Sequence, residues 1–286
     1  MNSLKFQRNE LKNLAAKLKT SPELITTVCE NIDKYYSEWT EKKIDKNSGQ
    51  VKTYADGTPK TRIITPSKGD LKAIQNSIKK NILNAIPLPI YVQGGTTGKS
   101  NISNAKLHQG KKYKFTTDLK DFFPRITNKQ VNRLFICLGY SKQAAHYLTR
   151  FCTYKGHLPQ GIPVSTHIAN LIFLPTDEQI MQIVSEKKIT YSRFVDDITL
   201  SSQTDFSHLL PVILHTIKSG GFSISNRKTT YSGDQTITGI RVFNNYIDAP
   251  EKIKEAAKLE VDKEFKPYTN YLNAIQNTNS AKRRAD

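Results

Sequence analysis

Three aspartates are the residues of this chain best suited to metal chemistry. Asp196 and Asp197 are adjacent and lie between two apolar runs, and Asp118 ends a separate apolar run. Carboxylates at the ends of neighbouring strands can bind hard divalent cations through their oxygens. Two such cations can activate one phosphate-ester oxygen and stabilise another in an in-line displacement. The pattern predicts metal-dependent phosphoryl transfer, although a pair of adjacent aspartates is also common in ordinary surface turns.

The charge of the chain indicates a polyanionic partner. Among 286 residues, 43 Lys and Arg stand against 25 Asp and Glu, which gives a formal net charge of +18. A surface this basic binds phosphate backbones of any sequence because counterions are released. The three cysteines (Cys29, Cys137 and Cys152) show no metal-ligand spacing and are expected to be reduced. No run is long and apolar enough for a membrane span and the start does not resemble a signal peptide, so we expect a cytoplasmic protein without membrane contact.

The elements before and around Asp118 follow from local patterns. Ser21-Pro22-Glu23 has the features of a helix start, and apolar residues continue at helical spacing to Trp39. The other expected elements are a hairpin over 52–65 turning at Ala55-Asp56-Gly57, a helix over 71–86, a strand over 112–119, and helices over 128–138 and 141–152 separated by Gly139.

The second half of the chain continues this mixture. The pattern predicts a helix after Pro163, two strands over 189–202 joined at Asp196-Asp197, a hairpin turning at Asn244-Asn245, and one polar helix from about 250. Helices and strands alternate without a strict βαβ rhythm. This favours an α+β fold with an antiparallel sheet and helices on one face.

Four ordered motifs and two hallmark motifs, over residues 50 to 245, resemble those of bacterial retron-type reverse transcriptases, the group that includes group II intron-like and defence-associated enzymes. They are TDLKDFFPRI around Asp118, QGIPVS (160–165) followed by Ala169-Asn170, FVDD (194–197), NRKT (226–229), and the retron hallmarks NAxxH (104–108) and ITG (237–239). The sequence departs from the family pattern at Phe194, where Tyr is usual, and at Ile237, where Val is usual.

The resemblance implies a right-hand polymerase fold with an antiparallel palm sheet and helical fingers. N-terminal helices and fingers would occupy residues 1–112, the palm with inserted fingers helices 113–245, and a short helical thumb 246–286. The last segment is short for a thumb, so a partner could complete it.

The resemblance also assigns roles in catalysis. Asp118, Asp196 and the backbone carbonyl of Leu119 would bind two Mg²⁺ ions, with Asp197 in support. Five residues would contact the incoming nucleotide or the template: Arg62 and Lys68 through phosphates, Phe123 as the residue that excludes a 2′-hydroxyl, Gln160, and Lys228 as a proton donor or a phosphate contact. The alternative for Phe123 is a place in the core, which Phe122 or Phe123 is expected to take.

A second group of residues is expected to bind structured RNA. Asn104 and His108 belong to the retron hallmark, and Lys111 and Lys112 extend it as a basic strip. His108 has the alternative of being a buried, hydrogen-bonded histidine. The glycine-rich segment 94–100 resembles a P-loop but has three residues between its glycines where four are needed, so a loop that contacts the template is favoured.

The expected function is therefore RNA-directed DNA synthesis. The resemblance implies reverse transcription of a structured non-coding RNA with deoxynucleoside triphosphates, giving RNA-linked single-stranded DNA in antiphage defence with an effector protein. One alternative is a protein-primed or untemplated defence-associated reverse transcriptase. Another is a non-catalytic RNA-binding module with the shape of a polymerase.

Overall fold

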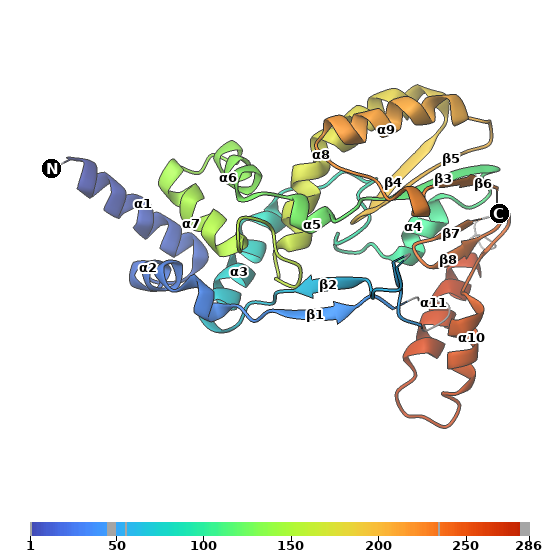
Figure 1. Cartoon of the computed structure of the whole chain (residues 1–286), viewed down its shortest axis with the longest axis horizontal. Helices are drawn as coiled ribbons and strands as arrows, with labels where there is room; N and C mark the ends of the chain where they lie inside the picture. The colour runs from blue at the N-terminus through green and yellow to red at the C-terminus, as the bar shows by residue number, and fades with distance from the viewer. Residues whose placement is uncertain (1, 45–49, 55, 234, 281–286) are drawn as a thin grey trace. The chain divides into compact units, whose positions relative to one another are not determined.

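The chain forms two compact units that interleave along the sequence. The computed structural model describes residues 2–44, 50–54, 56–233 and 235–280 (Figure 1). The first unit comprises Met1–Pro87 and Asp121–Ile172, and the second comprises Leu88–Lys120 and Phe173–Asp286. Both units are discontinuous in sequence, because the chain leaves each of them and later returns to it. The division into fingers, palm and thumb stays a prediction. No helix in the described ranges has the length and apolar character needed to cross a membrane.

The first unit is mainly helical. Its helices are α1 (Asn2–Leu18), α2 (Pro22–Glu30), α3 (Gly69–Asn81), α5 (Phe122–Arg125), α6 (Asn128–Cys137), α7 (Lys142–Cys152) and the start of α8 (Ser165–Val184), with the short 3-10 helices η1 (Ile32–Tyr35) and η2 (Leu83–Ala85). Ser21 caps α2 as expected, because its hydroxyl accepts the Leu24 N–H at 3.1 Å. Gly139, with φ +87°, follows α6 in the left-handed conformation that favours glycine.

A long hairpin completes the first unit. Strand β1 (Trp39–Lys42) pairs antiparallel with β2 (Thr61–Ile64), and Gly57 at the tip has φ +82°. The predicted return strand is confirmed, but the helix does not continue to Trp39, which starts β1 instead. Over only a few residues, the spacing of apolar side chains does not tell whether a residue such as Trp39 ends a helix or begins an exposed strand. Ala55 of the predicted turn lies outside the described residues.

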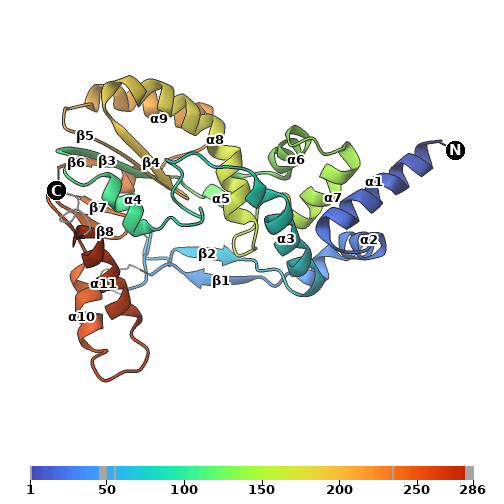
Figure 2. The ribbon, with the colours of Figure 1, turned by 180° about the vertical axis from the view of Figure 1, so that it is seen from behind.

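The second unit is built on a four-stranded antiparallel sheet. Its order is β4 (Thr190–Phe194), β5 (Asp197–Ser202), β3 (Tyr113–Asp118) and β6 (Thr230–Ser232). Figures 1 and 2 show α9 (Leu210–Ser219) and the later part of α8 along one face. The 3-10 helices η3 (Ser185–Lys187), η4 (Ser207–Leu209) and η5 (Asn226–Lys228) lie in the connections.

The sheet is covered on both faces, as the contacts of three successive residues of β4 show. Successive residues of a strand point to opposite faces of a sheet. Tyr191 and Arg193 of β4 contact Asp177 on α8. Ser192, between them, contacts Asn104 on α4 (Asn101–Leu107). The sequence prediction that helices lie on one face is therefore wrong for this sheet.

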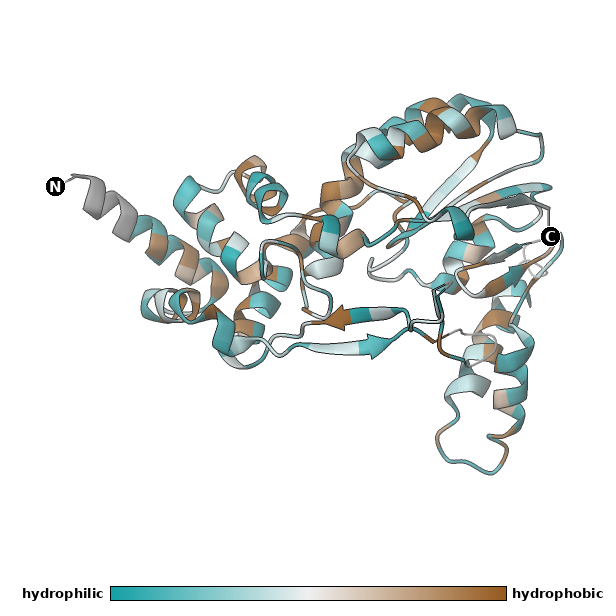
Figure 3. Cartoon of the chain, viewed as in Figure 1, coloured by the Kyte–Doolittle hydropathy of each residue, from teal (hydrophilic) through white to brown (hydrophobic). Residues whose placement is uncertain are grey.

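A smaller sheet and a helical hairpin end the chain. Strands β7 (Gln235–Ile237), β8 (Ile240–Val242) and β9 (Ile247–Asp248) form the sheet, and their apolar side chains pack with α4 and α11. In place of one polar helix there are two, α10 (Glu251–Lys258) and α11 (Pro267–Ser280). The Glu260 carboxylate accepts the N–H groups of Tyr268 and Thr269 and so starts the second helix. Figure 3 shows that α10 is mostly hydrophilic.

Candidate active site

Sheet register brings two of the three predicted aspartates face to face. Asp118 at the end of β3 is the direct partner of Asp197 at the start of β5, and Asp197 also pairs with Phe194 of β4. Asp196 lies in the two-residue turn between β4 and β5. The sequence prediction that these acids share one end of neighbouring antiparallel strands is confirmed.

Backbone hydrogen bonds fix the third aspartate next to this pair. The Leu119 N–H donates to the Asp196 carbonyl at 2.8 Å, and the Ser225 N–H donates to the Asp118 carbonyl at 2.8 Å. The turn also holds a strained residue, since Val195 has φ +60°. A β-branched residue in this region costs about 1–3 kcal/mol and persists only where its surroundings enforce it.

Lys228 forms an ion pair with one of the aspartates. It ends η5, and its Nζ lies 2.6 Å from Asp118 Oδ1, with side-chain exposures of 58% and 13%. Burial alone would lower the pKa of Lys228, but the hydrogen bond and charge of Asp118, with Asp197 and Asp196 nearby, outweigh it and raise that pKa. Lys228 is therefore a protonated group beside the acidic cluster, as its predicted role requires.

The acidic cluster is electrostatically crowded. Burial, followed by the charges of Asp196 and Asp118, raises the pKa of Asp197 to about 7. Negative groups held this close favour a cation among them. Carboxylate oxygens are also the donors that Mg²⁺ prefers. The carboxylates of Asp118, Asp196 and Asp197 therefore fit the predicted Mg²⁺ ions both by their charge and by their oxygen donors.

The carboxylates are not arranged as a closed metal cage. Among the residues that the structure describes, no three His, Cys, Asp or Glu side chains are gathered closely enough to hold a metal ion. A cavity of about 160 Å³ adjoins the cluster, and its walls include Asp118, Asp197, Lys228 and Thr238. The Lys228 ammonium occupies one carboxylate oxygen of Asp118, so a cation bound to that oxygen would compete with it.

The two hallmark residues predicted to bind RNA are buried. Asn104 and His108 are 1% and 0% exposed. His108 makes 2.7 Å hydrogen bonds to Ser192 and Ser201, and the side-chain amide oxygen Oδ1 of Asn104 accepts from the Ser192 hydroxyl. Direct RNA contact by Asn104 and His108 is therefore wrong, and the alternative of a satisfied, buried histidine is correct. Burial, with Lys114 and Lys111 adding to it, lowers the pKa of His108 to about 3.

The basic residues after this motif remain accessible. Lys112 is exposed and its ammonium lies 5.4 Å from the centroid of the Tyr113 ring, while Lys111 is half-buried. Their predicted RNA contact stays a prediction.

The remaining predicted site residues belong to the first unit. Gln160 precedes Gly161, and its carbonyl accepts the Thr65 N–H at 2.8 Å, which ties this motif to the end of β2. Gly161 has φ +112°, and a Cβ there would lie 3.3 Å from Ile64. Glycine is favoured here because a residue with a side chain would be strained at this φ, and the Ile64 side chain would have to shift slightly to admit a Cβ.

Arg62, Lys68 and Phe123 are accessible side chains of the same unit. Arg62 on β2 forms a 2.8 Å ion pair with Glu41 on β1, and Lys68 is exposed at the start of α3. Phe122 is in the core, whereas Phe123 is half-buried. Phe122 therefore takes the core position, and the contacts of the other three with nucleotide stay predictions.

The sequence patterns did not predict a buried ion pair next to the turn between β4 and β5. Arg193 and Asp177 are both 0% exposed, and Arg193 Nη2 lies 2.6 Å from Asp177 Oδ2. The available signal was a charged residue inside each of two apolar runs, since buried charges need partners. The lysine of the glycine-rich segment does not reach outward as a P-loop lysine would. Lys99 Nζ donates to backbone carbonyls just before the segment, that of Ile90 at 2.7 Å and that of Val92 at 3.0 Å.

Comparison with known proteins agrees with this geometry. Residues 44–277 match the family model described as reverse transcriptase (RNA-dependent DNA polymerase). The retron Ec86 reverse transcriptase of Escherichia coli is 34% identical over 199 residues, 68% of this chain and 62% of the relative. The retron Se72 reverse transcriptase of Salmonella heidelberg is 30% identical over 223 residues, 74% of this chain and 59% of the relative. The chain thus spans about three fifths of the length of these two relatives.

Proposed function

Because the chain belongs to the reverse transcriptase family and its curated relatives are retron enzymes, we propose that it is an RNA-directed DNA polymerase that copies a structured non-coding RNA. The observation that carries this proposal is the pairing of Asp118 with Asp197 across β3 and β5, with Asp196 in the adjoining turn. In this assignment the four-stranded sheet is the palm, the mainly helical first unit supplies the fingers, and α10 and α11 form a short thumb.

Reverse transcriptases generally use divalent metal ions, and we assign two Mg²⁺ to Asp118, Asp196, Asp197 and the Leu119 carbonyl. When bound, the ions activate the attacking hydroxyl oxygen and stabilise the leaving phosphate oxygen. The chain's own residues orient the reaction. Backbone bonds hold Asp196 beside Asp118. We assign the Lys228 ammonium, which forms an ion pair with Asp118, as the group that would donate a proton or a hydrogen bond to the leaving pyrophosphate.

The finer parts of the proposal concern the nucleic acid. The charge of +18 supports phosphate-backbone binding, and Lys111 and Lys112 are the residues assigned to RNA beside the palm. Arg62, Lys68, Phe123 and Gln160 are assigned to the deoxynucleoside triphosphate and template. We further propose RNA-linked single-stranded DNA as product and a role in cytoplasmic antiphage defence with an effector, because the relatives are retron enzymes.

Sequencing of the nucleic acid that copurifies with the expressed protein tests the proposal. We expect a DNA of defined length joined to a structured RNA, sensitive to both ribonuclease and deoxyribonuclease. DNA linked to protein, or homopolymeric DNA, would instead identify a protein-primed or untemplated enzyme. Copurifying RNA without any DNA, and no extension of a primer on an RNA template, would identify a non-catalytic RNA-binding module.

A further inference from the structure

The turn that carries Asp196 and Asp197 is held from two sides by residues without a role in the proposed reaction. The turn needs such support, because Val195 has the positive φ of +60° that a hairpin turn usually gives to glycine. A valine leaves this conformation readily unless its neighbours fix it.

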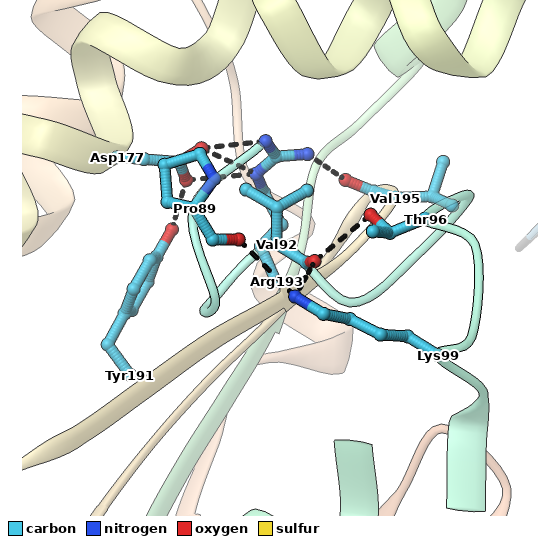
Figure 4. A network of polar contacts seen from close by, with 8 residues as sticks. All are labelled: Pro89, Val92, Thr96, Lys99, Asp177, Tyr191, Arg193 and Val195. Carbon is cyan, nitrogen blue, oxygen red and sulfur yellow. Dashed lines mark hydrogen bonds and ion pairs between the residues drawn. The ribbon is translucent and has the colours of Figure 1, made fainter. Parts of the chain in front are cut away.

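The first support is the Arg193 side chain. Its Nη1 donates to the Val195 carbonyl at 3.0 Å, while Nε and Nη2 donate to the Asp177 carboxylate at 2.9 and 2.6 Å (Figure 4). Tyr191 donates its hydroxyl to the same carboxylate. Asp177 lies on α8, so the guanidinium connects the carbonyl of the strained residue to a helix that covers the sheet.

The second support is the glycine-rich segment together with Val92 and Gln93, which directly precede it. The Gln93 N–H donates to the Arg193 carbonyl at 2.8 Å, and Val92 forms an isolated parallel bridge with Arg193. A Cβ at Gly94 would lie 2.7 Å from Phe194 C and nearer still to Val195 N, so the backbone there touches the turn directly. Lys99 holds this stretch in shape through the Ile90 carbonyl and through the Val92 carbonyl, the second of which Figure 4 shows.

We propose that Arg193 and Gly94 are positioning residues that clamp the Val195 turn and so set the metal-binding geometry of Asp196 and Asp197. The inference rests on the proposed function, because that function makes these aspartates metal ligands. Residues that orient metal ligands typically change metal affinity 10–100-fold when they are replaced. The clamp also gives the glycine-rich segment a role other than phosphate binding.

Three variants and one control test the clamp. Gly94→Ala adds a methyl group against the turn, and Arg193→Lys keeps a buried charge for Asp177 but loses the planar fork that also reaches Val195. Lys99→Met keeps the stem of a partly buried side chain and removes only the carbonyl contacts. Gly98→Ala is the control, because Gly98 has φ +77° and open space around its Cβ, so it adds backbone strain without touching the turn.

The measurement is Mn²⁺ binding to the RNA-free protein by electron paramagnetic resonance, with circular dichroism and thermal unfolding to confirm the fold. We expect Gly94→Ala and Arg193→Lys to weaken Mn²⁺ binding about 10–100-fold. Lys99→Met should weaken it by a smaller factor, and Gly98→Ala should leave it within about twofold of wild type. Primer extension should show a lower kcat with an unchanged KM for template.

Wild-type Mn²⁺ affinity in folded Gly94→Ala and Arg193→Lys overturns the clamp, as does an equal loss in Gly98→Ala. If Gly94→Ala and Arg193→Lys do not fold, unchanged binding by Lys99→Met overturns it. A wild-type protein that binds Mn²⁺ and loses it on clamp substitution, yet makes no DNA, supports the clamp and overturns the proposed function. A wild-type protein that does not bind Mn²⁺ overturns both.

Discussion

The ammonium nitrogen of Lys228 lies 2.6 Å from Oδ1 of Asp118, at the point where sheet register places Asp118 opposite Asp197. One cation of the chain thus neutralises part of an acidic cluster in which burial and neighbouring charge raise the pKa of Asp197 to about 7. A divalent ion held by these carboxylates would compete with Lys228 for Asp118. An ammonium displaced in this way would be free to contact a phosphate.

Lys228→Gln should change metal binding and catalysis in opposite directions. Loss of the competing charge should tighten Mn²⁺ binding by the RNA-free protein severalfold, since a unit charge at 4 Å is worth about 1 kcal/mol even in water. Loss of a general acid should slow nucleotide incorporation by roughly a hundredfold or more. Mn²⁺ titration and single-turnover incorporation measure the two effects.

Arg227→Gln removes the same charge from the neighbouring, exposed position and serves as the control for Lys228→Gln. A higher KM for nucleotide with an unchanged rate in Lys228→Gln would assign Lys228 to a phosphate contact alone. No change in either measurement would remove it from the site.

His108 should make the fold sensitive to acid. Its pKa is lowered to about 3 in the folded chain and is about 6.5 when unfolded, so below pH 6.5 the unfolded chain takes up a proton that the folded chain does not. The contribution of His108 to stability is thus complete above pH 6.5 and is lost as the pH falls toward 3. Between pH 7 and 5.5, the free energy of unfolding should fall by about 1 kcal/mol from this residue.

Urea unfolding of wild type and His108→Gln at the two pH values measures the contribution of His108. We expect the variant to be less stable at pH 7 and to lose about 1 kcal/mol less on acidification. A selective loss of affinity for a structured RNA by a fully stable His108→Gln would contradict the buried role.

Phe122 and Phe123 form a matched pair for the sugar-selection prediction. Phe122 is 3% exposed, so Phe122→Ala should cost about 3–5 kcal/mol of stability and leave selectivity per folded molecule unchanged. Phe123→Ala should fold and accept ribonucleotides, because truncation frees the space that a 2′-hydroxyl needs. Incorporation of ribo- and deoxynucleotides under identical conditions measures this, and unchanged selectivity in a folded Phe123→Ala would rule Phe123 out.

Arg62 and Glu41 offer a second matched pair. The exposed ion pair between them holds the guanidinium on the hairpin at little gain in stability. Arg62→Gln should raise the KM for deoxynucleotide about tenfold, the effect of losing about one charge-assisted hydrogen bond. Glu41→Gln should leave that KM unchanged or lower it. Equal effects of the two substitutions would show that the hairpin, and not the guanidinium, matters.

The acidic site could be predicted from the sequence because its signals are local. Mostly buried strands end at Asp118 and begin at Asp197, and a two-residue turn leaves only one antiparallel register for β4 and β5. The pairing of β3 with β5, which are distant in the sequence, was predicted only from the chemistry of carboxylates that could share a metal ion at the ends of neighbouring strands.

Burial of polar groups could not be predicted in the same way. His108 follows a short helix and precedes lysines, a pattern typical of a basic surface, yet the helix packs on the sheet and places the ring between Ser192 and Ser201. Arg193 and Asp177 are 16 residues apart in the sequence, and each by itself has the pattern of an exposed charged residue. Whether such groups are exposed depends on tertiary partners that periodicity does not encode.

The most direct test of the central claim compares DNA synthesis with RNA affinity in Asp196→Asn, with Asp197→Asn beside it. Extension of a primer on an RNA template with deoxynucleotides and Mg²⁺ should be abolished in both variants, because carboxylate oxygens there stabilise charge that develops in the transition state. RNA affinity at fixed salt should stay within about threefold of wild type, since the phosphates are held by Lys and Arg side chains elsewhere. Retained synthesis in either variant, or a loss of RNA binding equal to the loss of activity, would contradict the assignment of these aspartates as the catalytic centre.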